Sequence, residues 1–207
     1  MEKTLSFSEP FLNVEHISYE ENYEIDEKSI LINIDLDPLE LEETDLDPLK
    51  SLVCAHTVIE KVKNIVVISV ADEDYLGNNP KVDREIIKNR WQHIYDLTND
   101  EHLQSTALWR SEKTRVGRVE LNLWYAEAGT QCGIHNQHDF METHTQIYGI
   151  GRMQKFRFNK ITSLYQEVYM SPGYSHDPFY SNLGKYPWHQ YYADTDCIWL
   201  AIEQHSE

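Results

Sequence analysis

Five of the ten histidines in this 207-residue chain lie between His135 and His189. Three of them fall in the segment GIHNQHDFMETHTQIYGIG, which carries His135, His138, Glu142 and His144. Imidazole nitrogens and carboxylate oxygens are common protein ligands of divalent transition metals. The clustering therefore predicts a metal site in the second half of the chain.

A strand over residues 138–146 would place every second side chain on one face. The side chains on that face would be those of His138, Phe140, Glu142, His144 and Gln146. So polar a face is costly in an apolar core, because each buried polar group needs a partner. A divalent metal would satisfy several of these groups at once.

The spacing of this segment resembles the first sequence motif of the cupin family. That motif has a histidine pair, three or four further residues, a glutamate, six residues and a glycine. Here His138, Glu142 and Gly149 reproduce its later part. The family's first histidine would stand at Asn136, and His135 is one residue out of register. Either a bulge turns His135 inward, or the site has only three protein ligands, and the sequence leaves both open.

The second cupin motif has a Pro-Gly turn followed by a histidine on a later strand, and two segments compete for this role. SPGYSH offers His176, whereas YPWHQYYADTDCIWLAIE offers His189. We favour His189 because its segment ends in the apolar run CIWLAI, as expected of the last strand of a barrel. His176 would then lie in a loop near the mouth.

The resemblance implies a ligand set, and two further histidines, His144 and His176, could be ligands or could line the pocket as acid or base groups. The expected metal ligands are His135, His138, Glu142 and His189. The expected acid or base groups beside them are His144 and His176. Such a site suits one divalent transition metal, with Fe favoured and Mn, Ni, Cu or Zn as alternatives.

Short β-like segments separated by turns follow from about Thr106 onward. Their sequences are RVELNLWYA, FMETHTQIYGIG, RMQKFRF, LYQEVYM, HQYYA and CIWLAIE. Several short strands at this spacing favour a sandwich or small barrel over a parallel α/β sheet. The predicted fold is mainly β, and the cupin resemblance implies a jelly-roll barrel, a double-stranded β-helix, over residues 105–207.

Residues 1–104 are expected to form an acidic, α-containing extension or cap. The segment DLDPL occurs twice, and Asp-Pro suits the start of a short helical turn. Apolar spacing further predicts a helix over residues 49–61, a strand over 65–70 and a second helix from about residue 82 to Asn99. No recognisable catalytic set occurs in residues 1–100.

The net charge of −17 would repel nucleic-acid phosphates and anionic lipids, so neither is an expected partner. No apolar run approaches the roughly 20 residues needed to cross a bilayer. The three cysteines are far apart, and the first residues lack the pattern of a secretory signal. A soluble, cytoplasmic protein is the resulting expectation.

These observations lead to three functional hypotheses. The first is a metal-dependent cupin enzyme acting on a small organic molecule, specifically a non-heme iron oxygenase or dioxygenase. The second is a non-redox isomerase, epimerase or lyase that uses the metal as a Lewis acid. The third is a cupin that binds a small ligand without turnover. The resemblance also implies a homodimer.

Overall fold

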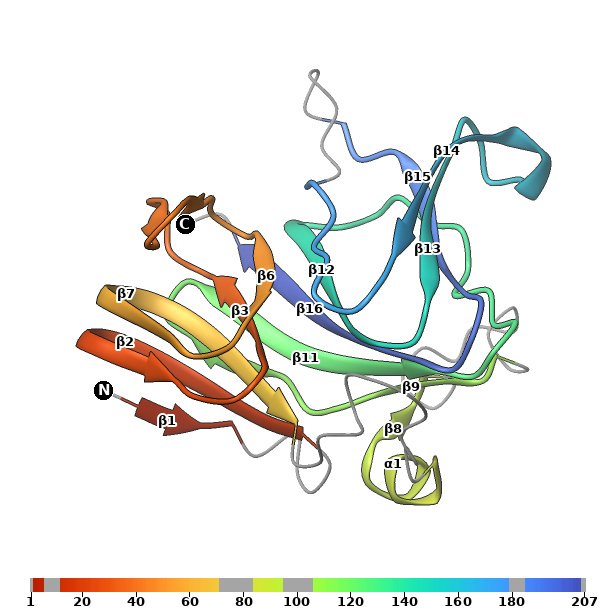
Figure 1. The fold of residues 1–207 in the computed structure, drawn as a ribbon. Coiled ribbons are helices and arrows are strands. Elements are labelled where there is room, and N and C mark those ends of the chain that lie inside the picture. The colour runs from red at the N-terminus through yellow and green to blue at the C-terminus, as the bar shows by residue number, and fades with distance from the viewer. Residues whose placement is uncertain (1, 6–11, 71–83, 95–105, 179–184, 206–207) are drawn as a thin grey trace. The chain divides into compact units, whose positions relative to one another are not determined.

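Figure 1 shows the computed structural model, which describes residues 2–5, 12–70, 84–94, 106–178 and 185–205. Strands dominate the described chain, so the predicted mainly β fold is confirmed. The described residues contain one α-helix, α1 (Arg84–Arg90), and one 3₁₀ helix, η4 (Ile161–Ser163), and both are too short to cross a membrane. Helix α1 confirms the first part of the second predicted helix, but it ends at Arg90 and β8 (Gln92–His93) follows after Trp91. The predicted continuation from Tyr95 to Asn99 lies outside the described residues.

The chain divides into two compact units. The first comprises Met1–Val82 with Gly173–Ser175, and the second comprises Asp83–Pro172 with His176–Glu207. The sequence-based division at residue 104 differs from this one, since α1 and β8 belong to the second unit.

The first unit is built on an antiparallel five-stranded sheet with the order β1-β2-β7-β3-β6, and it also contains the hairpin β4-β5. Its strands are β1 (Glu2–Thr4), β2 (Leu12–Ile25), β3 (Ser29–Asn33), β4 (Leu39–Glu40), β5 (Asp45–Leu46), β6 (Ser51–Cys54) and β7 (Thr57–Val70). Buried aliphatic side chains, among them Ile17, Leu31 and Ile65, form its core.

The helix predicted over residues 49–61 is wrong, because this segment forms β6 and the first part of β7. Its apolar spacing resembles that of a helix, but the β-branched Val58 and Ile59 fit a strand better. The backbone of β7 pairs with β2, with Ile59 opposite Tyr23. The strand predicted over residues 65–70 is confirmed as the end of β7.

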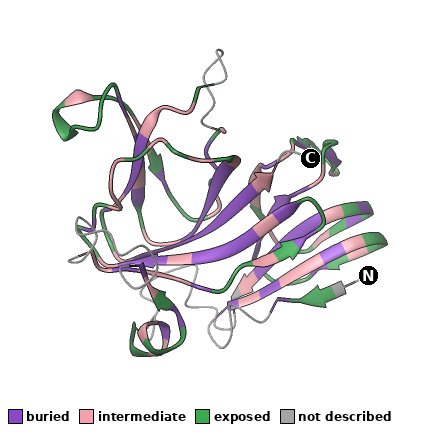
Figure 2. Cartoon of the chain, turned by 180° about the vertical axis from the view of Figure 1, so that it is seen from behind, coloured by how far each residue is buried: buried purple, intermediate pink, exposed green. Residues whose placement is uncertain are grey.

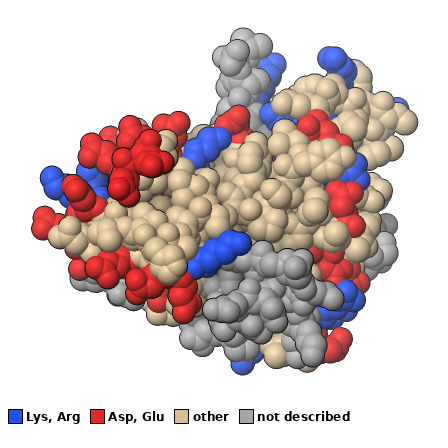
Figure 3. Space-filling view, viewed as in Figure 1, with Lys and Arg blue, Asp and Glu red and all other residues tan. Residues whose placement is uncertain are grey.

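The predicted helical turns at the two DLDPL segments are also wrong. These segments form bends, a turn and the short strands β4 and β5. Asp and Glu side chains gather over this hairpin (Figure 3), where Glu40, Glu42, Glu43 and Asp45 are exposed. The acidic stretch is therefore a solvated surface in this unit.

The second unit contains two antiparallel sheets. The larger has the order β12-β16-β11-β9-β8, with β10 also paired to β11, and the smaller has the order β14-β13-β15. Its remaining strands are β9 (Leu108–Arg110), β10 (Thr114–Val116), β11 (Val119–Ala126), β12 (Phe140–Tyr148), β13 (Gly151–Phe156), β14 (Leu164–Met170), β15 (Trp188–Ala193) and β16 (Cys197–His205). All six strands predicted after residue 106 are confirmed, with shifts of a few residues at their ends.

The core of the second unit joins the two sheets. Trp199 on β16 stacks on Tyr191 of β15 with ring centroids 4.1 Å apart, and Met153 of β13 packs in the same cluster. The long strands of the larger sheet are mainly buried (Figure 2). This burial explains why β16 reads as the continuous apolar run CIWLAI instead of alternating with polar residues.

Gly149 makes the turn between β12 and β13, which takes the chain from one sheet to the other. Its φ of +73° lies in the left-handed region, and a Cβ there would lie 2.0 Å from the carbonyl oxygen of Asp196. Only glycine fits this turn without displacing the backbone of its neighbour. The glycine that completes the sequence motif therefore has a structural role.

Candidate metal centre

Three histidines from two segments of the second unit meet at one point. His135 and His138 lie in the segment before β12, and His189 lies on β15. The backbone N–H of His135 donates to the carbonyl of His189 at 3.0 Å, and the N–H of His189 donates back at 2.9 Å. This reciprocal pair holds the two residues directly opposite each other.

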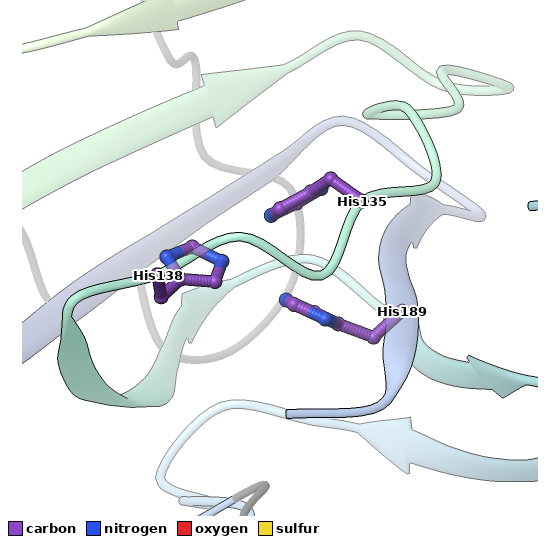
Figure 4. A group of neighbouring side chains, drawn as sticks. All are labelled: His135, His138 and His189. Atoms are coloured by element: carbon purple, nitrogen blue, oxygen red, sulfur yellow. The ribbon is translucent and has the colours of Figure 1, made fainter. Parts of the chain in front are cut away.

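The side chains of His135, His138 and His189 point toward a common centre (Figure 4). One ring nitrogen from each lies within 4.8 Å of the other two. Nitrogens bonded to one ion at about 2.1 Å lie at most roughly 4 Å apart, so this spacing is close to that of a metal site. The three histidines could therefore hold one metal ion.

The protonation of these histidines suits a metal. Nδ1 of His135 donates to the carbonyl of Gly133 at 2.9 Å, and Nδ1 of His189 donates to the carbonyl of Pro187 at 3.0 Å. A proton on Nδ1 makes Nε2 the lone-pair nitrogen that a metal needs, as in many histidine sites. The buried Nε2 of His138 has no hydrogen-bond partner among the described residues.

Burial also keeps two of these rings neutral. It lowers the pKa of His189 to about 3, and it lowers the pKa of His138 as well. Neutral imidazole is the form that binds a metal, because a proton on the ligand nitrogen would compete with the ion. The residues present thus fit a divalent transition metal.

Glu142 on β12 lies next to the histidine group but bonds elsewhere. Its Oε1 is 3.1 Å from Nε2 of His144, whereas its Oε2 is 3.9 Å from Nε2 of His138. Burial raises the pKa of this carboxyl, but its interaction with His144, which includes a hydrogen bond, outweighs burial and holds the pKa well below its usual range. Glu142 is therefore ionised, and its nearest partner is His144.

The histidines line a cavity of about 740 Å³ in the second unit. His138, Phe140, Glu142 and His144 all line it, so this part of the polar face predicted from alternation points inward. Gln146, the last residue of the predicted face, is not in the cavity wall and accepts a hydrogen bond from the hydroxyl of Tyr191. Apolar and aromatic side chains form other parts of the cavity wall, among them Leu108, Trp124, Met153 and Trp199. A cavity of this size and lining is typical of sites for small organic molecules.

Solved structures resemble the chain over about half of its length. They include a cupin superfamily protein from Desulfitobacterium hafniense (TM-score 0.37, 11% identity, 48% of this chain and 78% of the other). Several of these matches are cupins. The ectoine synthase of P. lautus also matches (TM-score 0.37, 12% identity, 55% and 75% covered), as does an oxalate oxidase (TM-score 0.37, 13% identity, 49% and 53% covered). No protein-family model and no curated protein matches the sequence.

His176 lies in the second unit but outside the histidine group. Its Nε2 accepts a hydrogen bond from the backbone N–H of His144 at 2.9 Å, and its Nδ1 donates to the carbonyl of Asp177 at 2.7 Å. Both ring nitrogens are thus engaged by the backbone, and His176 positions the strand that carries His144. Its predicted part in proton transfer stays a prediction.

The burial of His176 makes a testable contribution to stability. Burial lowers its pKa to about 3, below the value of about 6.5 expected in the unfolded chain. Between these values the unfolded chain binds a proton that the folded chain does not, so the free energy of unfolding falls as the pH falls. We expect a loss of up to about 1.4 kcal/mol per pH unit from this group.

The measurement is denaturant unfolding of metal-free protein between about pH 7 and about pH 4.5, for wild type and His176→Gln. Glutamine can keep one donor and one acceptor but does not titrate. The wild type should lose stability more steeply than the variant, and equal slopes would show that His176 does not carry this effect.

Three charged residues of the cavity wall were missed in the sequence: Arg110 at the end of β9, Lys113 before β10 and Glu203 on β16. Nothing in the local pattern singles them out, because they are far from the histidine segment along the chain. Nζ of Lys113 bonds Glu203 and lies 4.0 Å from Glu120. A second group that could hold a metal, Glu120, Glu203 and His205, is therefore already occupied by a lysine ammonium.

Proposed function

We propose that the chain is a metal-dependent enzyme that acts on a small organic molecule in this cavity, by iron-dependent oxygenation. The observation that supports this most directly is the convergence of three histidines on the wall of a cavity of about 740 Å³. A divalent ion held by three protein nitrogens keeps coordination positions open for other ligands. Non-heme iron oxygenases need such positions for substrate and O2.

A bound ferrous ion would supply the electron chemistry that lets O2 react with an organic molecule. His135 and His189 would orient it, because their Nδ1–H groups are fixed on backbone carbonyls. His138, which lies in the same segment before β12 as His135, would be the third metal ligand. The aromatic walls would keep bulk water away from the reacting molecule.

Glu142 and His144 have the geometry of a proton-transfer pair. With Nε2–H of His144 donating to Glu142, the ring's Nδ1 is the nitrogen that can accept a proton. This Nδ1 is buried and has no hydrogen-bond partner among the described residues. Glu142 would stabilise the imidazolium that forms when His144 takes a proton from the substrate.

The same pair favours a second candidate function. A non-redox isomerase, epimerase or lyase needs a Lewis acid and a base, and the metal with His144 would supply both. This reaction would need no O2. The third possibility is a cupin that binds its ligand without turnover. Such a protein needs neither the Glu142–His144 pair nor open coordination positions on the metal.

Oxygen uptake separates these functions. Untagged protein loaded with Fe(II) would be supplied with a panel of small organic acids and their amides, with O2 followed by electrode and products by mass spectrometry. We expect stoichiometric O2 consumption with product, absent in the His189→Ala variant. Product formed under strictly anaerobic conditions would instead support the isomerase or lyase. The homodimer, the cytoplasmic location and the absence of nucleic-acid and membrane partners stay predictions.

A further inference from the structure

Arg110 is a charged side chain of the cavity wall that forms no ion pair with another described residue. It lies opposite Trp124 across β9 and β11, with its guanidinium carbon 5.5 Å from the Trp124 ring centroid. Its Nε is buried and has no hydrogen-bond partner, and no ion pair joins it to another described residue. Burial lowers the pKa of this guanidinium, and the charge of Glu203 opposes the shift only in part.

The carboxylates that line the same cavity are already bound. Glu203 accepts a hydrogen bond from Nδ2 of Asn122 at 3.1 Å and pairs with Nζ of Lys113. Glu142 bonds His144. Among the described Arg, Lys and Glu side chains of the cavity wall, Arg110 is thus the one that forms neither an ion pair nor a side-chain hydrogen bond. Arg110 is half-buried, so part of its guanidinium has lost its hydration, and a bound anion would compensate for that loss.

Other donors in the cavity wall also lack acceptors. The indole Nε1 atoms of Trp124 and Trp199 are buried without a hydrogen-bond partner among the described residues. The two indole rings are nearly parallel, with centroids 6.1 Å apart. Tryptophan and arginine nitrogens donate but never accept. The residues that line the cavity thus include three that carry a donor nitrogen without an acceptor, Arg110, Trp124 and Trp199, and acceptor oxygens of a ligand would suit them.

We infer that the ligand of this cavity is a small organic carboxylate with an apolar body, and that Arg110 binds its carboxylate. The apolar body would lie against the aromatic and aliphatic walls. The inference rests on the proposed function for the place of the substrate, and it adds the substrate class. Arginine suits this role because its planar guanidinium can donate two parallel hydrogen bonds to a carboxylate.

Calorimetric titration of matched probes tests this inference. The probes are benzoate with benzamide, and butyrate with butyramide, which differ in charge but little in shape. The proteins are wild type, Arg110→Met, Arg110→Lys and the control Arg115→Met, which removes an exposed arginine of β10. Each is titrated both metal-free and loaded with Zn(II), after a check of folding.

In wild type and Arg115→Met we expect at least one carboxylate to bind about tenfold or more tightly than its amide. Arg110→Met should lose about tenfold to a hundredfold of that affinity with amide binding unchanged, and Arg110→Lys should keep part of it. This preference should appear in metal-free protein, so it would stand even if metal binding failed. A preference seen only with Zn(II) and unchanged in Arg110→Met would assign the carboxylate to the metal and overturn the inference. Equal binding of acid and amide, or no binding of either acid by folded wild type, would also overturn it.

Discussion

Replacing His189 with Ala should weaken the binding of a divalent transition metal by at least about a hundredfold. Loss of a residue that hydrogen-bonds a metal ligand typically lowers metal affinity tenfold to a hundredfold. Loss of the ligand itself should lower it at least as much. His189 lies opposite His135 through two backbone hydrogen bonds, so alanine can keep the fold of this segment while it removes the nitrogen.

Competitive titration against a chromophoric chelator measures this affinity in untagged protein. His93→Ala is the matched control, since His93 lies on β8 of the same unit and outside both groups of possible metal ligands. His135→Ala and His138→Ala should resemble His189→Ala. Equal affinities for His189→Ala and His93→Ala would contradict the proposed ligand set.

Replacing Glu142 with Gln should lower the turnover number by about a hundredfold to ten-thousandfold while the metal is retained. Glutamine keeps the shape of the side chain but cannot stabilise a positive charge on His144, 3.1 Å away. The initial rate with the substrate found by oxygen uptake, together with the metal content, measures both effects.

Glu167→Gln is the control, because Glu167 on β14 also accepts hydrogen bonds from side chains, those of Arg152 and Gln154. It should change turnover little. If Glu142→Gln lost its metal as fully as His189→Ala does, Glu142 would be a metal ligand, as the cupin resemblance implied. That result would contradict its proposed role in proton transfer.

The strands of the second unit could be predicted because the order of polar and apolar residues in each strand matches the burial of its two faces. In β12 the alternation of Phe140, Glu142 and His144 marks the side that lines the cavity. In β16 the unbroken apolar run marks burial on both faces. The segment 49–61 failed because helical spacing and β-branched residues conflict there, and pairing of β7 with β2 decided the outcome.

The register of His135 could not be settled from sequence, because strand alternation does not apply to it. His135 and His138 precede β12, which begins only at Phe140. Backbone bonds to His189, a residue far along the chain, place His135 beside it. The structure brings the three histidines together without a bulge in a strand, and their role as ligands stays a prediction.

Arg110 was missed for a similar reason. Its position at the end of a three-residue strand shows no pattern, and its importance comes from neighbours such as Trp124 and Glu203 that only the folded chain provides. Local sequence can indicate which side chains face inward. It cannot indicate which inward charge lacks a partner.

The metal content of the untagged wild-type chain tests the central claim most directly. The protein would be supplied in turn with Fe, Mn, Ni, Cu and Zn, desalted, and analysed by mass spectrometry of the elements. The three converging histidines predict about one equivalent of at least one of these metals, lost in His135→Ala, His138→Ala and His189→Ala. A folded wild type that retains none of them would contradict the metal site and the metal-dependent function built on it.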